Sequence, residues 1–208
     1  RGQIDRIDTA VSQGRRVAIV VDYKTSEKKL EWAQLYHGLD LQLPIYLLAV
    51  ENAKANGRID AEPVGAFYMP IEASPKQGGL DEAADTEARF ARKARGLFDG
   101  SCFRLLDQGA SGNNPFYSFH VNRDGEPYGY QGKRDVLRPE QFSAVLRYAR
   151  GRVEDLARQI LSGVIGVRPY RLAGRTPCML CDYRSVCRFD EHTHEYRELD
   201  TMDKSQFL

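Results

Sequence analysis

The chain has 208 residues, of which 42% are hydrophobic and 28% are charged, and its formal net charge is +1. This composition is typical of a soluble globular protein with one or two domains. No apolar run approaches the roughly 18 residues of a membrane span, which excludes a transmembrane helix. The near-neutral charge neither supports nor excludes a nucleic-acid partner, because that depends on a local basic surface.

Two short segments at the N-terminus predict a β-hairpin. Residues 2–8 alternate apolar and charged side chains, and residues 17–22 are a β-branched run that ends in an acid. Residues 12–15 would form the turn between these two strands. Such a hairpin brings Asp5 near Asp22, and two converging carboxylates attract a divalent cation. The alternative for either residue is a solvated acid at a strand edge.

The second predicted strand ends in the sequence Asp22-Tyr23-Lys24. Alternate residues of a strand point the same way, so Asp22 and Lys24 leave one face together. The acid can bind a hard cation, and the amine can orient a water or offset developing negative charge. The alternative is a surface ion pair, which is common and contributes little to stability.

A helix is predicted over about residues 39–56, because apolar side chains recur at spacings of three and four and Gly57 follows. Pro44 indicates a kink or a local start of the helix. Gln42 and Tyr46 are four residues apart and share a face. They can contact a phosphate backbone or position the lysine. The alternative for Tyr46 is a core side chain whose hydroxyl is satisfied.

The middle of the chain alternates between helical and extended patterns: a short helix within 27–38, a strand at 64–70, a loop at 74–81 and a charged helix at 86–98. Basic residues of the last helix line a DNA path or, more commonly for such a pattern, form a solvated face: Arg89, Arg92, Lys93 and Arg95. Residues 100–138 are rich in Gly, Asn, Pro and Asp and predict long loops with a small hairpin near 116–121.

The clearest helix is predicted over residues 139–162, with Pro139 in its first turn and Gly163 after its end. Its inward side chains are Phe142, Val145, Leu146, Ala149, Val153, Leu156, Ile160 and Leu161. Its opposite face carries Arg147, Arg150 and Arg158. Residues 165–172 are expected to be extended and to pack on the edge of the sheet.

Three cysteines form a C-x2-C-x5-C pattern at Cys178, Cys181 and Cys187, and Cys102 lies far upstream. Disulfide pairing is arithmetically possible, but this spacing more often marks a metal or an iron–sulfur cluster. Three thiolates can bind three corners of such a site. Cys102 either supplies the fourth corner or is an isolated small apolar residue. The segment after Asp190 is polar, and we expect it to be mobile.

In their order and spacing, these motifs resemble the RecB-type branch of the PD-(D/E)XK nucleases. The resemblance rests on Gly-x-Ile-Asp5-Arg-Ile-Asp, Val-Asp22-Tyr-Lys24-Thr-Ser, Gln42-x3-Tyr46 and the final Cys-x2-Cys-x5-Cys-x-Phe-Asp. Within the branch the chain is similar to the C-terminal nuclease domain of AddB-type helicase–nuclease subunits. We therefore expect a fragment of a larger subunit, with a nuclease domain at 1–190, a loop-rich insert at 75–135 and a polar tail at 191–208.

The resemblance implies an α/β fold with a restriction-endonuclease-like core, in which a mixed central β-sheet is flanked by helices. It also implies Mg²⁺-dependent hydrolysis of DNA. The catalytic residues that it assigns are Asp5, Asp22, Lys24, Gln42 and Tyr46, with Asp5, Asp22 and the backbone carbonyl of Tyr23 as metal ligands. Family members also hold a [4Fe–4S] cluster through three cysteines after the core, here Cys178, Cys181 and Cys187, and one before it. Cys102 does not match the position of that first cysteine.

The resemblance further implies that the partners are DNA and an AddA-type helicase–nuclease subunit, in a cytoplasmic complex that resects double-strand breaks for recombinational repair. No membrane is expected. Three other interpretations remain open. The chain can be a Cas4-like iron–sulfur exonuclease, a catalytically silent DNA-binding or scaffold module, or a zinc-binding structural domain in which the acids have no catalytic role.

Overall fold

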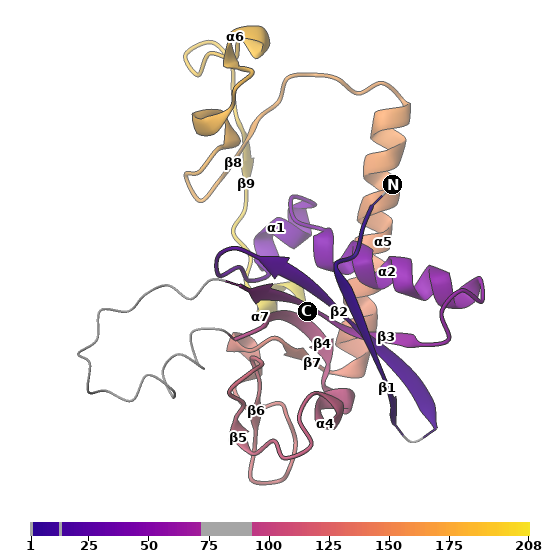
Figure 1. Cartoon of the computed structure of the whole chain (residues 1–208). Coiled ribbons are helices and arrows are strands. Elements are labelled where there is room, and N and C mark those ends of the chain that lie inside the picture. The colour runs from indigo at the N-terminus through magenta and orange to yellow at the C-terminus, as the bar shows by residue number, and fades with distance from the viewer. Residues whose placement is uncertain (1, 13, 72–92) are drawn as a thin grey trace.

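A five-stranded mixed β-sheet forms the centre of the molecule (Figure 1). The structure is a computed structural model and describes residues 2–12, 14–71 and 93–208. In the order in which they lie side by side, the strands are β1 (Arg6–Ser12), β2 (Arg15–Lys24), β3 (Glu62–Pro70), β4 (Arg95–Asp99) and β7 (Val136–Leu137). Two neighbouring pairs are antiparallel (β1–β2 and β3–β4) and two are parallel (β2–β3 and β4–β7). The predicted α/β fold with a mixed central sheet is confirmed.

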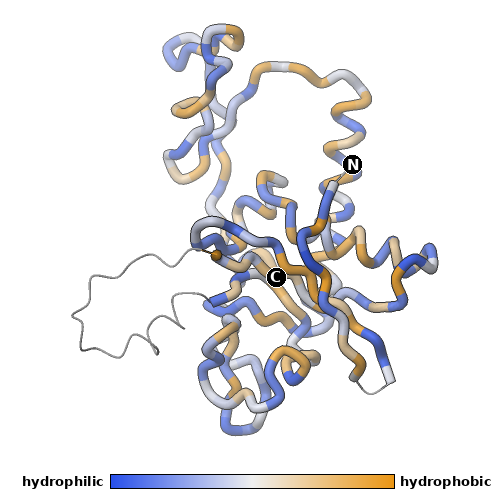
Figure 2. Tube along the Cα trace, viewed as in Figure 1, coloured by the Kyte–Doolittle hydropathy of each residue, from blue (hydrophilic) through white to orange (hydrophobic). Residues whose placement is uncertain are grey.

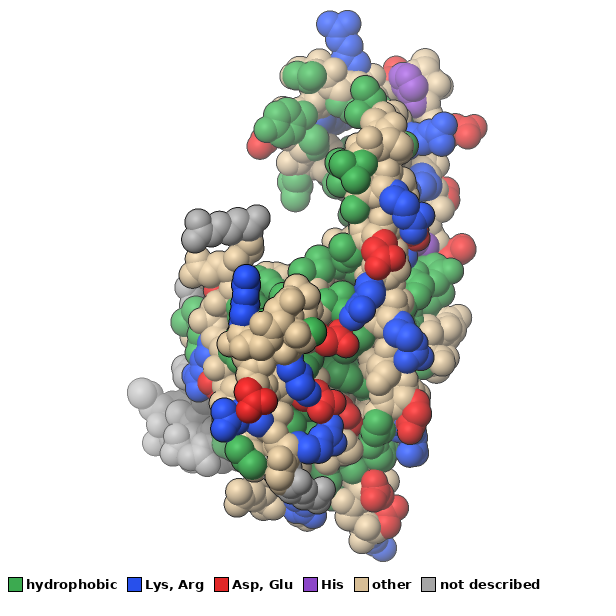
Figure 3. Space-filling view, turned by 90° about the vertical axis from the view of Figure 1, so that its right-hand side faces the viewer, with side chains coloured by type: hydrophobic (Ala, Val, Ile, Leu, Met, Phe, Trp, Pro, Cys, Tyr) green, Lys and Arg blue, Asp and Glu red, His purple; other side chains and the backbone are tan. Residues whose placement is uncertain are grey.

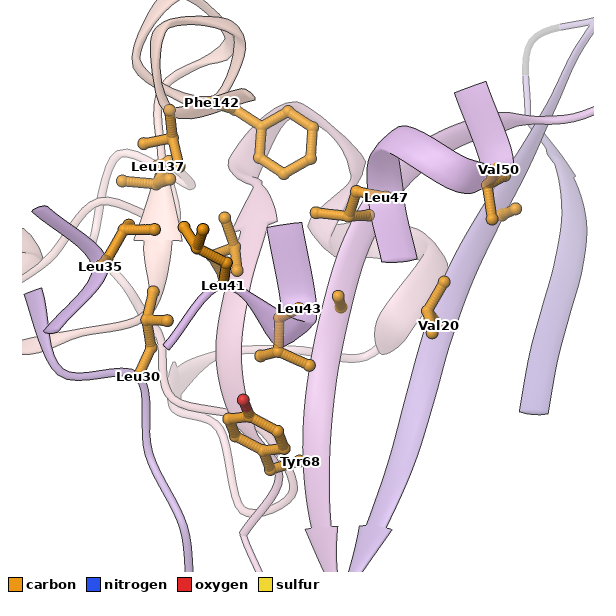
Figure 4. Packing of buried hydrophobic residues seen from close by; sticks show 14 of the residues in the cluster. Val20, Leu30, Leu35, Leu41, Leu43, Leu47, Val50, Tyr68, Leu137 and Phe142 are labelled. Atoms are coloured by element: carbon orange, nitrogen blue, oxygen red, sulfur yellow. The ribbon is translucent and has the colours of Figure 1, made fainter. Parts of the chain in front are cut away.

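Three helices cover one face of this sheet: α1 (Trp32–His37), α2 (Gln42–Ala55) and α5 (Pro139–Leu161). The sheet and these helices enclose one hydrophobic cluster, which includes Val20, Leu43, Leu47, Tyr68 and Phe142 (Figure 4). The predicted helix at 39–56 begins later than expected, at Gln42, so Pro44 lies in its first turn. At that position the N–H that proline lacks would have had no helical partner. Pro44 therefore marks a local start rather than a kink.

The opposite face of the sheet carries the loop-rich segment 100–138. This segment contains a 3-10 turn η1 (Gly100–Cys102), the short helix α4 (Phe103–Leu106), the two-stranded sheet of β5 (Gly112–Asn113) and β6 (His120–Val121), and a second turn η2 (Gln131–Lys133). A second cluster is buried here, around Phe67, Phe98 and Phe119. Strand β3 serves both clusters because alternate residues point to opposite faces. The sheet is thus buried on both sides, and the small hairpin is confirmed.

The predicted helix at 86–98 is wrong over its last residues, because β4 begins at Arg95. Gly96 lies so close to β3 that a Cβ there would meet the carbonyl oxygen of Ala66 at 2.0 Å. Strand pairing therefore overrides the helical spacing of the apolar residues. Arg95 does not face a DNA path, since its guanidinium binds Asp135 at 2.9 Å. The predicted loop at 74–81, together with Arg89 and Arg92, lies outside the described residues.

Helix α5 is confirmed almost residue for residue, but its last turn is not inside the protein. Phe142, Val145 and Ala149 are buried, whereas Ile160 and Leu161 are 76% and 86% exposed. Figure 1 shows the reason, since the C-terminal part of α5 extends beyond the sheet and has no layer to pack on. Within the parts of the chain that the structure describes, no helix is long and apolar enough to cross a membrane.

Residues 169–199 form a separate small unit, which we call the cysteine lobe (Figure 1). It contains β8 (Tyr170–Leu172), a 3-10 turn η3 (Pro177–Leu180), α6 (Arg184–Cys187) and β9 (Arg197–Leu199). Strand β8 pairs with β9 and not with the central sheet. The prediction that residues 165–172 pack on the sheet edge is therefore wrong. Figure 2 shows hydrophobic residues concentrated in the central strands, whereas the lobe mixes hydrophilic and hydrophobic residues.

The segment after Asp190 is ordered by its return to the core, contrary to the predicted mobile tail. It ends in α7 (Lys204–Phe207), and the ring of Phe207 lies 5.2 Å from that of Trp32 and 5.0 Å from that of Tyr148. Lys204 is buried and its Nζ donates to the carbonyl oxygens of Arg134 and Val136 at 2.7 and 2.6 Å. The cysteine lobe is consequently attached to the core at both of its ends.

Candidate active site

Asp22 is a buried carboxylate at the end of β2. The strand lies between β1 and β3, and the Asp22 side chain is 4% exposed. Its Oδ1 accepts a hydrogen bond of 2.9 Å from Nε2 of Gln42. Its Oδ2 lies 2.6 Å from Nζ of Lys24, in an ion pair whose direction does not make a hydrogen bond. Oδ2 therefore keeps acceptor capacity in a buried position, where an unfilled acceptor is costly.

Asp5 lies one residue before β1, and its carboxylate is turned toward β2. Its Oδ2 accepts a hydrogen bond of 3.0 Å from the backbone N–H of Tyr23. The last paired residues of the two strands at this end are Arg6 and Val21, so the Asp5 carboxylate replaces the next backbone partner. The predicted hairpin is confirmed, although its first strand begins at Arg6 and not at Gly2. It brings Asp5 to the backbone beside Asp22.

Gln42 and Tyr46 lie on the same face at the start of α2, as their spacing predicts. The Nε2 group of Gln42 donates to Asp22 and also to the hydroxyl of Tyr46, at 2.9 and 3.0 Å. One amide thus connects the acid and the phenol. Tyr46 is half-buried and packs against the main hydrophobic cluster, so its ring has a packing role and its hydroxyl faces the polar site.

A second polar group adjoins this site and was not found by the sequence analysis. The buried Tyr68 pairs with Asp22 in the register of β2 and β3, and its hydroxyl donates to Oδ1 of Asp40 at 3.1 Å. Burial, and then the negative charge of Asp40, raise the pKa of Tyr68 far above its usual value. Nζ of Lys28 lies 2.9 Å from Oδ2 of Asp40. In sequence Lys28 is one of two adjacent lysines in a polar segment, and Asp40 falls inside the overlong predicted helix.

The aromatic ring of Tyr68 relates the two lysines of the site. Nζ of Lys24 lies 5.3 Å and Nζ of Lys28 lies 4.3 Å from the centre of this ring. These distances are in the range of cation–π interactions. Two ammonium groups and two carboxylates are therefore gathered around one buried tyrosine at the end of β2 and β3.

The oxygen donors at the strand ends suit a hard cation. Mg²⁺ in proteins usually binds through one or two carboxylates and keeps several waters, so a cage of protein ligands is not needed. Asp22 offers an oxygen with open acceptor capacity, and Asp5 adds a second carboxylate at the same strand end. Over residues 2–12, 14–71 and 93–208, no three His, Cys, Asp or Glu side chains converge into a metal-binding group. The donor set therefore fits Mg²⁺ better than a metal that requires four protein ligands.

The three clustered cysteines line one cavity of the cysteine lobe, with a volume of about 700 Å³. All four cysteines of the chain are free, so the disulfide alternative is not found. Cys102 lines a different cavity of about 260 Å³, together with Ile19 and Phe98. Burial raises the pKa of the Cys102 thiol, which suits an apolar setting rather than thiolate ligation. The structure thus groups Cys178, Cys181 and Cys187 and separates Cys102 from them.

Comparisons with known proteins agree with this geometry. A family model described as the PD-(D/E)XK nuclease superfamily matches residues 1–188. The AddB protein of the ATP-dependent helicase/deoxyribonuclease from Bacillus licheniformis is 33% identical over the whole chain, and that from Moorella thermoacetica is 36% identical over 91% of it. The corresponding protein of Bacillus pumilus is 32% identical over 91% of the chain. The chain spans only 17–18% of the length of these relatives.

Proposed function

The chain belongs to the PD-(D/E)XK nuclease superfamily, and from this premise we propose that it hydrolyses DNA phosphodiesters with Mg²⁺. We assign it as the nuclease domain of an AddB-type subunit of a helicase–nuclease that resects double-strand breaks for recombinational repair. The observation that carries the proposal is the buried Asp22, whose Oδ2 has an ion pair but no hydrogen bond, beside Lys24 and Asp5. A surface ion pair would not be buried in this way.

Each residue of the site has a distinct task in this proposal. Asp5 and Asp22, with the carbonyl of Tyr23, would hold Mg²⁺, which when bound polarises a phosphate oxygen and lowers the pKa of a bound water. Gln42 fixes Oδ1 of Asp22 by its hydrogen bond, which directs the carboxylate. Lys24 provides a positive charge on the attacking side, where negative charge develops on the phosphate.

The position of Lys24 supports this assignment. Its side chain is 28% exposed, whereas that of its partner Asp22 is 4% exposed. The ammonium group can therefore reach a substrate while the carboxylate stays in a site of low dielectric, where charge interactions are stronger than in water. Tyr46 is held by the same amide as Asp22 and completes the motif that follows the lysine.

For the cysteine lobe we propose a [4Fe–4S] cluster bound by Cys178, Cys181 and Cys187, with a fourth ligand from outside residues 1–208. The three thiols line one cavity, and no residue from 150 to 203 is buried. A segment without a buried core needs a staple such as a metal cluster to hold its shape. The cysteines and the carboxylate site are then separate in function, which favours a nuclease over a zinc-binding structural domain.

The relatives' printed name guides the remaining assignments, all of which are proposals. They are a DNA substrate cut as an exonuclease, an AddA-type subunit as partner and a cytoplasmic location. A Cas4-like exonuclease fits the motifs as well, but the relatives above carry the name of a helicase/deoxyribonuclease component over the whole length of the chain. Intact acids and lysine argue against a silent DNA-binding or scaffold module.

The substitution Asp22→Ala tests the proposal. We expect the loss of Mg²⁺-dependent cleavage of linear DNA by at least about 10³-fold, because the main oxygen ligand is removed, while DNA binding and circular dichroism change little. The matched control is Asp60→Ala, since the Asp60 side chain is 88% exposed and pairs with Arg16 only at 4.0 Å. Undiminished cleavage by the Asp22 variant would refute the catalytic assignment and leave the scaffold interpretation.

A further inference from the structure

Lys28 lies at the edge of the proposed catalytic site, although no motif includes it. Its Nζ is 4.3 Å from the centre of the Tyr68 ring, over which Lys24 also lies at 5.3 Å. The two nitrogens are therefore separated by no more than the sum of these distances. Along one DNA strand, a phosphate recurs about every 3.4 Å of helix axis, so a gap of this size spans neighbouring phosphates.

The environment of Lys28 holds its ammonium group in place without occupying it fully. Its partner Asp40 also accepts a hydrogen bond from the hydroxyl of Tyr68 and a longer one, at 3.4 Å, from the N–H of Gln42. Asp40 thus keeps other donors if Lys28 turns to a different anion. The Lys28 side chain is 36% exposed, whereas that of Asp40 is 10% exposed. Ion pairs at this degree of exposure contribute little to stability, so the exchange of partners costs little.

The adjacent Lys29 shows what an ordinary surface lysine looks like in the same segment. Its side chain is 58% exposed and lies 3.2 Å from the exposed Glu31. Lys28 differs in that its partner is nearly buried and connects, through Tyr68 and Gln42, to the strand ends that carry Asp22.

We propose that Lys28 is a positioning residue of the nuclease site that binds the DNA phosphate next to the one that is cleaved. Asp40 and Tyr68 hold it beside Lys24, so that one strand is gripped at two successive phosphates. This inference rests on the proposed function. It assigns Lys24 to the reacting phosphate and Lys28 to substrate register, and it predicts separate kinetic effects for the two lysines.

Binding of a single-stranded oligonucleotide by the 208-residue chain, followed by fluorescence anisotropy in EDTA over a range of salt concentrations, tests this inference. For Lys28→Gln we expect about 5- to 20-fold weaker binding at 0.1 M salt and a slope of log K against log salt that is smaller by about 0.7, the contribution of one phosphate contact on a single strand. With Mg²⁺, KM should rise by a similar factor while kcat stays within about twofold. Lys28→Arg should restore the slope, and Lys29→Gln should not change it.

The possible outcomes separate this inference from the function on which it rests. A wild-type chain that neither binds nor cuts DNA would refute the proposed function and the role of Lys28 together. If the wild type cuts DNA and Lys28→Gln keeps the wild-type salt slope, only the role of Lys28 is refuted, even if that variant unfolds at a lower temperature. A loss of kcat with unchanged KM would also overturn it, because Lys28 would then act in the chemical step.

Discussion

The strand-end site and the cysteine lobe differ in what determines their geometry. The strand-end side chains come from residues 5–68 and rest on β1, β2, β3 and α2, which pack around a buried core. The cysteine lobe has no buried residue, and several of its large apolar side chains are exposed, among them Met179, Leu180, Tyr183 and Val186. Figure 3 shows hydrophobic side chains on the surface of this part of the molecule, across an open gap from the core.

This difference means that one site is built by the chain itself and the other requires something that it binds. Asp22, Lys24 and Gln42 reach each other through strand register and the first turn of a helix, so their contacts exist without metal or substrate. The three cysteines share a cavity but do not converge into a metal-binding group in the described part of the chain. A bound cluster with an outside ligand would supply the missing constraint, as structural metal sites contribute folding free energy directly.

The largest effect should follow from Cys181→Ser in the full-length subunit. Loss of one of three thiolates should abolish the visible absorbance of the proposed cluster after anaerobic purification, and the lobe should become far more sensitive to proteases. Cys102→Ser is the matched control and should keep the absorbance, because Cys102 lines another cavity. An unchanged spectrum for Cys181→Ser, or a colourless wild type with bound zinc, would contradict the cluster.

The sequence predicts the first of these two regions much better than the second. The hairpin, α2, β3 and the positions of Gln42 and Tyr46 follow from short-range periodicity and spacing. Asp40 and Lys28 were missed because their importance depends on Tyr68, whose place beside Asp22 is set by pairing between distant strands. For the same reason β4 was mistaken for a helix, since Gly96 has meaning only against the backbone of Ala66.

The errors near the C-terminus have a different cause. Polar composition after Asp190 predicts mobility, but one aromatic residue and one buried lysine are enough to fix α7 on the core. A helix pattern continues to Leu161, but whether its last turn is buried depends on where the neighbouring layer ends. Neither the docking of a short segment nor the end of a layer is written in local periodicity.

A smaller effect, and a direct comparison of the two regions, comes from the same substitution in each. Leu47 is fully buried, so Leu47→Ala should lower the free energy of unfolding by about 2–5 kcal/mol through lost burial and a residual cavity. Leu180 is 93% exposed, so Leu180→Ala should change it by less than about 0.5 kcal/mol. Urea denaturation followed by circular dichroism measures both. A cost for Leu180→Ala as large as that for Leu47→Ala would mean that the lobe has a core of its own.

The smallest effect concerns the anchor by which the cysteine lobe returns to the core. Burial lowers the pKa of Lys204 from 10.5 to about 8, against the opposing charge of Asp135. Between these two pH values the unfolded chain binds more protons at this residue than the folded chain, so folding stability should rise with pH. The slope is at most about 1.4 kcal/mol per pH unit, which gives roughly 1–2 kcal/mol between pH 8 and pH 9.5.

Lys204→Met removes the titrating group, and its stability should lack this rise, so the difference between wild type and variant isolates Lys204 from other titrations. Urea denaturation at several pH values between 7.5 and 9.5 provides the measurement. Parallel pH profiles would show that the ammonium group is not desolvated in the folded state. The two carbonyl oxygens of Arg134 and Val136 would then compensate its burial fully, and α7 would be an anchor without a cost.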